Sequence, residues 1–97
     1  MYLEIVSPEA ILFGSEVDSV VVPGVNGEFQ MLNNHAAIVS SLAKGTIKIH
    51  THNQSHIVFD DLHGSLKPHK DDNKIITLVI NSGTLEMKNN KAVILVD

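Results

Sequence analysis

"TLEMKNNKAVILVD", residues 84–97, holds two runs of alternating apolar and polar residues on either side of Asn89-Asn90. Alternation with a period of two is typical of strands that bury one face. Asparagine tolerates the left-handed backbone angles that a tight hairpin turn requires. This stretch therefore predicts a β-hairpin that turns at Asn89-Asn90.

Strand-like patterns continue through most of the chain. Residues 10–24 contain two apolar runs around Gly14-Ser15, and Pro23-Gly24 ends the second run with a turn. The other predicted strands lie within residues 2–6, 27–32, 45–52 and 74–83. Seven or more short strands with closely spaced turns indicate an all-β fold, a β-sandwich or barrel.

Two stretches depart from this pattern. Residues 34–44, NHAAIVSSLAK, are predicted to form a loop with one helical turn, because Leu42 follows Ile38 by four residues. Residues 53–73 are rich in Asp and His, and we interpret them as a hairpin or loop inserted between two strands. Residues 56–62 within them are an alternative further strand. The length of residues 1–97 fits a single domain.

Three apolar runs are long enough to be buried on both faces. They lie at residues 20–22, 75–76 and 94–96. They predict either plain sandwich core or a sheet with one face covered by a partner protein.

Composition excludes several classes of protein. The chain has no cysteine, which removes disulfides and thiolate metal sites. Its net charge of -4 disfavours non-specific nucleic-acid binding, and full protonation of its six histidines would reverse that sign. The first ten residues have no basic segment followed by an apolar run, so we expect a soluble, cytosol-facing protein.

Residues 27–35 contain the candidate site. Alternation places Phe29 and Met31 on one face of a strand and Glu28, Gln30 and Leu32 on the other. Glu28 and His35 have three interpretations: an acid/base couple, a binding surface, or solvated loop residues. Catalysis would need a third positioned group and a pocket, and no Ser-His-Asp or metal motif surrounds the two residues.

No metal or cofactor site is predicted. His50 and His52 share a strand face and His56 follows, but zinc needs a third or fourth ligand at a fixed spacing. The Asp pairs at 60–61 and 71–72 lack the pattern of an EF-hand. Residues 24–27, GVNG, lack the Lys-Ser/Thr and the helix of a phosphate loop.

Residues 3–49 resemble the start of the epsilon subunit of bacterial F-type ATP synthases. The resemblance is carried by the order of short motifs. They are LEIVSP at 3–8, VPG at 22–24, GEF at 27–29, ML at 31–32, HA at 35–36 and KGTIKI at 44–49, with Gly83, Leu85 and Glu86 later in the chain.

The resemblance implies a flattened β-sandwich of about ten short strands at the foot of the central stalk, against the gamma subunit and the c-ring. Such a subunit catalyses nothing and needs no cofactor; it couples rotation to ATP synthesis at the cytoplasmic face of the bacterial inner membrane, as a peripheral protein. The implied partner-binding residues are Glu28, Gln30, Leu32, Asn33, Asn34 and His35. Glu28 would pair with basic c-ring loops, and His35 is similar to a gamma-contacting histidine.

The chain also departs from the family pattern. Gln30 replaces a glycine, and Asn33-Asn34 displaces a proline, which suggests a more flexible turn. Ala37 stands in place of another proline, and Asn81-Ser82-Gly83-Thr84 in place of Ser-Gly-Gly-Phe. The inhibitory C-terminal helical hairpin of many members is expected to be absent, although a shortened version of a longer chain would look the same.

Two other functions remain open at this point. The first is a free-standing β-sandwich binding module whose histidine-rich hairpin responds to metal or pH. The second is a small enzyme that uses Glu28 and His35.

Overall fold

The computed structural model describes residues 1–51, the backbone of residues 66–68, and residues 75–97. The described residues contain ten strands and no helix. The strands are β1 (Tyr2–Val6), β2 (Ile11–Glu16), β3 (Ser19–Gly24), β4 (Gly27–Leu32), β5 (Ile38–Leu42), β6 (Gly45–His50), β7 (Leu66–Pro68), β8 (Ile75–Ile80), β9 (Gly83–Lys88) and β10 (Lys91–Val96). The predicted all-β fold is confirmed.

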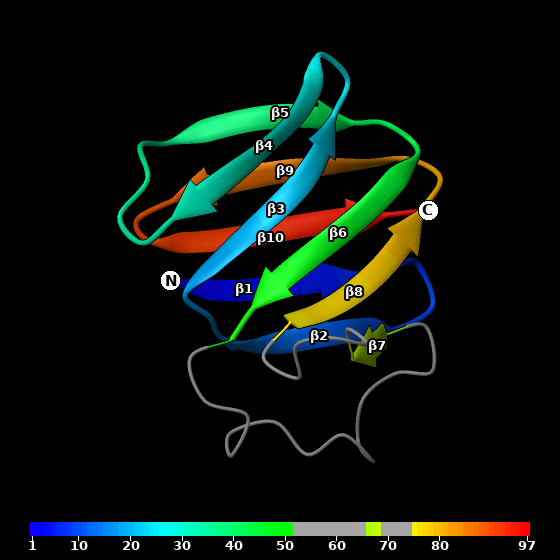
Figure 1. The fold of residues 1–97 in the computed structure, drawn as a ribbon, viewed down its shortest axis with the longest axis horizontal. Helices are drawn as coiled ribbons and strands as arrows, with labels where there is room; N and C mark the ends of the chain where they lie inside the picture. The colour runs from blue at the N-terminus through cyan, green and yellow to red at the C-terminus, as the bar shows by residue number, and fades with distance from the viewer. Residues whose placement is uncertain (52–65, 69–74) are drawn as a thin grey trace.

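The strands form one sheet that folds back on itself into two layers. Its order is β2-β1-β10-β9-β5-β3-β6-β8-β7, with β4 paired to β3 beside this path. In Figure 1, β4, β3, β6 and β8 run diagonally in front of β5, β9, β10, β1 and β2. The two layers enclose the core, as in a flattened sandwich.

The first and last strands lie side by side in the back layer. β1 and β10 pair in parallel, with Leu3 opposite Ala92 and Ile5 opposite Ile94. All four side chains are buried, so the first and the last strand of the chain both contribute to the core. Sequence alternation identifies β1 and β10 as strands, but it does not predict that they pair in parallel.

The core is built by alternate residues of both layers. Leu85, Met87 and Ile94 come from the back layer, and Val20, Val22 and Met31 from the front layer. The three apolar runs also alternate. Val21 is only half-buried between two buried valines, and Leu95 is 54% exposed between two buried residues. These runs therefore bury one face each.

The predicted hairpin at Asn89-Asn90 is confirmed. Lys88 and Lys91 face each other at the ends of β9 and β10, which leaves a two-residue turn. Asn89 and Asn90 have φ values of 53° and 59°. Two successive positive φ angles match the turn type whose twist suits antiparallel strands.

Replacing Asn89 by alanine is expected to lower the free energy of unfolding by about 1 kcal/mol, because alanine is strained at positive φ. Asn89→Gly is the matched control, since glycine adopts these angles without strain. Urea denaturation of both variants checks the prediction. Equal destabilisation by alanine and glycine would show that the turn does not depend on left-handed angles.

The prediction of a helical turn in residues 34–44 is wrong. Residues Ile38–Leu42 form strand β5, which pairs with β9 and buries Leu42. The spacing between Ile38 and Leu42 fits period two as well as a helical turn. The β-branched Ile38 and Val39 and an available partner strand favour the strand.

The two apolar runs predicted around Gly14-Ser15 lie in two different strands, β2 and β3, and Gly14 and Ser15 themselves belong to β2. β2 runs through both residues and ends at Glu16, so the connection to β3 is Val17-Asp18. The register between β1 and β2 shifts between Ile5 and Val6, which places one extra residue in β2. Leu12 and Phe13 are consequently both buried, as expected at a β-bulge.

The segment interpreted as an insertion, residues 53–73, lies largely outside the described residues. Residues 66–68 form the short strand β7, which pairs with β8. The inserted hairpin or loop and the alternative strand at 56–62 stay predictions.

Candidate functional site

The alternation predicted for residues 28–32 is confirmed in β4. Glu28, Gln30 and Leu32 are exposed, whereas Phe29 is half-buried and Met31 is fully buried. Met31 packs in the core between the layers, so the strand is fixed from one side. The other side displays a carboxylate, an amide and an apolar side chain.

Glu28 and Gln30 both contact other strands of the front layer on this outer face. The Glu28 carboxylate lies 3.9 Å from the ammonium group of Lys48 in β6. The Gln30 amide donates a hydrogen bond of 3.2 Å to the Ser19 hydroxyl in β3. Both ion-pair partners are about half exposed, so the pair contributes at most about 1 kcal/mol. Its main effect is to orient Glu28.

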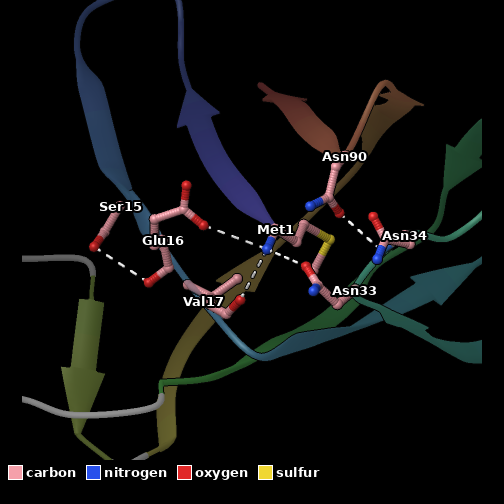
Figure 2. Close-up of polar contacts among 7 residues, drawn as sticks. All are labelled: Met1, Ser15, Glu16, Val17, Asn33, Asn34 and Asn90. Carbon is pink, nitrogen blue, oxygen red and sulfur yellow. Dashed lines mark hydrogen bonds and ion pairs between the residues drawn. The ribbon is translucent and has the colours of Figure 1, made fainter.

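Beyond β4, Asn33 is tied to the start of the chain (Figure 2). The backbone nitrogen of Met1 donates a hydrogen bond to the Asn33 side-chain oxygen. The same nitrogen lies 3.4 Å from the Val17 carbonyl oxygen and 3.3 Å from the Glu16 carboxylate. Asn33 therefore joins β4 to the connection between β2 and β3.

Asn34 is held by the hairpin of β9 and β10. Its backbone N–H donates a hydrogen bond of 2.7 Å to the side-chain oxygen of Asn90, as Figure 2 shows. Its φ of 63° is again left-handed, which asparagine tolerates. The His35 N–H donates to the Leu32 carbonyl at 3.1 Å. This turn is therefore fixed at several points, which differs from the more flexible turn suggested by the loss of proline.

The structure does not bring Glu28 and His35 together. Glu28 lies near the start of β4, and His35 lies three residues beyond its end. An extended strand rises about 3.3 Å per residue, so residues 28 and 32 alone are about 13 Å apart. The imidazole Nδ1 of His35 instead lies 2.8 Å from the Ala36 carbonyl oxygen. The acid/base couple has no geometric support.

The metal- or pH-responsive histidine hairpin stays a prediction. His50 is described, and its Nδ1 is buried without a hydrogen-bond partner in the described part of the chain. His52 and His56 lie outside the described residues. Within residues 1–51 and 75–97, no three His, Asp or Glu side chains are arranged to hold a metal.

One groove was not predicted from the sequence. It has a volume of about 540 Å³ and lies between the β1–β2 connection, the end of β8 and the end of β10. Leu12, Leu78, Ile80 and Val96 form its apolar floor, and Glu9 and Asp97 lie at its rim. Its residues are scattered over the sequence, so no local motif signals it.

The described residues contain no helix with the length and hydropathy needed to cross a bilayer.

Comparison with known proteins identifies the family. Residues 1–60 match the family described as "ATP synthase, Delta/Epsilon chain, beta-sandwich domain". The chain belongs to this family. The ATP synthase epsilon chain of Chlorobaculum tepidum is 32% identical over 95 residues, which cover 98% of this chain and 86% of that protein.

Other epsilon chains are longer. Those of Campylobacter curvus and Desulforamulus reducens are 46% and 30% identical over 58% and 98% of this chain. The matches cover only 43% and 57% of those two proteins, so the chain spans about half their length. Membership of the epsilon family agrees with the prediction of a non-catalytic subunit.

Solved structures show the same fold. A chain of the Euglena gracilis mitochondrial ATP synthase structure that contains F1 and the c-ring matches with a TM-score of 0.73 and 17% identity, over 97% of this chain and 48% of that one. A chain of the Tetrahymena thermophila central stalk and c-ring structure matches with a TM-score of 0.67 and 12% identity, over 98% and 61%.

Proposed function

We propose that this epsilon-type chain is a rotor subunit of a bacterial F-type ATP synthase that links the gamma subunit to the c-ring. It would lie at the cytoplasmic face of the membrane, held there through the complex. The supporting observation is the outer face of β4 with its fixed turn, which displays Glu28, Gln30 and Leu32 on a rigid support. ATP synthesis itself belongs to other subunits.

A rotor link must transmit torque without deforming. The site is suited to this because its displayed strand is backed by a closed core and its turn is bonded to two distant segments. Asn33 is bonded to the start of the chain, and Asn34 is bonded to Asn90. A preorganised surface of this kind loses little conformational entropy when a partner binds.

In this proposal Glu28 contacts a basic group of the c-ring or gamma. Lys48 does not prevent this contact, because a carboxylate accepts several hydrogen bonds. Replacing Glu28 by glutamine is expected to weaken binding to the gamma–c-ring assembly about 10- to 150-fold, since a hydrogen bond to a charged group contributes about 1.5–3 kcal/mol. Glutamine also avoids the repulsion from Lys48 that lysine would introduce.

Glu86→Gln is the matched control, since Glu86 is exposed on β9 in the other layer. Both variants are expected to lose at most about 1 kcal/mol of stability, because exposed charges contribute little to stability. Affinity is measured with reconstituted gamma and c-ring. Unchanged affinity of the Glu28 variant, or equal losses in both variants, would contradict the role given to Glu28.

A further inference from the structure

β4 has a free edge. It pairs with β3 along its whole length, from Gly24 opposite Gly27 to Ser19 opposite Leu32. Its other side has no partner strand among the described residues. A strand edge of this kind presents backbone N–H and C=O groups that another strand can bind.

The pairing with β3 fixes which backbone groups point to that edge. Pro23 has no N–H, and its carbonyl accepts a hydrogen bond of 2.7 Å from the Ala43 N–H on the side away from β4. Pro23 and its partner Glu28 are therefore a pair without mutual hydrogen bonds. Such pairs alternate along antiparallel strands, so Gln30 and Leu32 also direct their backbone groups outward.

The same three residues thus offer both their side chains and their backbone. Phe29 and Met31 use their backbone groups to bond β3, and their side chains point to the core. The Leu32 carbonyl already accepts from His35. The N–H groups of Glu28, Gln30 and Leu32 and the carbonyls of Glu28 and Gln30 have no strand partner at this edge among the residues that the structure describes.

Natural sheets protect their edges with bulges, lysine and proline. β2 carries the bulge at Leu12-Phe13, and the three-residue strand β7 contains Lys67 and Pro68. β4 has six residues in unbroken register and contains neither lysine nor proline. Its edge therefore has none of these three protections.

We propose that an extended segment of the gamma subunit adds to the free edge of β4 as a further strand. The segment would carry a basic residue beside Glu28 and an apolar residue beside Leu32. This inference rests on the proposed function, since it assigns the mode by which the stalk partner binds.

A second copy of this chain fits the edge less well. Antiparallel pairing of two β4 strands about Gln30 would set Glu28 of each copy against the apolar Leu32 of the other. Each copy also carries a net charge of -4. A different protein with a basic segment satisfies Glu28 without this mismatch.

Amide hydrogen exchange, read by NMR on the 10.6 kDa chain, tests the proposal residue by residue. In the free protein, the amides of Glu28 and Gln30 are expected to exchange fast, and those of Phe29 and Met31 slowly. On addition of gamma, exchange at Glu28, Gln30 and Leu32 is expected to slow at least about tenfold. Gamma binding with no change at these three amides would overturn the strand addition and leave the proposed function standing.

Gln30→Pro and Gln30→Ala provide a second, matched test. Both remove the side chain and its bond to Ser19, but only proline removes the outward N–H. Because that N–H does not bond β3, the pairing of β3 and β4 is expected to survive in both variants. Gln30→Pro should weaken gamma binding about tenfold more than Gln30→Ala, the loss expected when a hydrogen bond is removed and the proline ring blocks the edge.

Equal binding by the two variants would overturn the proposal. If gamma fails to bind the parent chain at all, the proposed function fails with it. Self-association through slowed amides at residues 28–32, without gamma, would assign the edge to a second copy instead and overturn the choice of partner.

Discussion

Replacing Leu85 by alanine is expected to lower the free energy of unfolding by about 3 kcal/mol. Leu85 is fully buried in β9, and it pairs with Ile94 in β10 and Ser40 in β5. The smaller side chain leaves a cavity between the two layers that the paired strands on both sides cannot close. For a domain of this size, the melting temperature should fall by about 12–24 °C.

Leu95→Ala is the matched control, because it makes the same change on the opposite face of the same hairpin. Leu95 is 54% exposed, so its loss is expected to cost less than about 1 kcal/mol. Thermal and urea unfolding of both variants give the comparison. Similar losses at the two positions would mean that the hairpin does not bury its Leu85 face in a sandwich core.

Replacing Gly83 by alanine is the second large effect we expect, a loss of about 2 kcal/mol of stability. A Cβ atom at Gly83 would lie 2.7 Å from the Leu95 carbonyl oxygen, which is closer than real contacts allow. The obstacle is backbone, so β9 and β10 would have to move apart. Gly83 pairs with β5 on its other side, which limits that movement.

Gly14→Ala separates this backbone clash from the general effect of removing a glycine. A Cβ atom at Gly14 would lie 3.0 Å from the Tyr2 hydroxyl, the far end of a side chain that can rotate away. We therefore expect a change of less than about 1 kcal/mol at Gly14. A Gly83 variant as stable as the Gly14 variant would show that the hairpin tolerates the displacement.

Local sequence patterns predicted those strands that show clear alternation or are bounded by a recognisable turn. The alternation in residues 27–32 placed Phe29 and Met31 inward, and Asn89-Asn90 marked a two-residue turn. β5 was missed because its spacing also fits a helical turn, and only the partner strand β9 decides between the two. The bulge in β2 was missed because it depends on the register with β1.

The candidate site likewise has features that the sequence predicts and features that it does not. Alternation was sufficient to predict that the side chains of Glu28, Gln30 and Leu32 lie on the outer face. The contacts that fix the turn join residues that are far apart in the sequence. Met1 and Asn33 are separated by 32 positions, and Asn34 and Asn90 by 56 positions. The Lys48 partner of Glu28 lies across an intervening strand. No local pattern encodes such contacts, so the turn appeared more flexible in the sequence than it is in the structure.

Reconstitution with gamma and the c-ring tests whether this chain is a rotor subunit. The purified chain should form a stable complex with gamma that joins the c-ring, and Glu28→Gln should weaken that complex while Glu86→Gln does not. A folded chain that binds neither gamma nor the gamma–c-ring assembly would contradict the proposed rotor function.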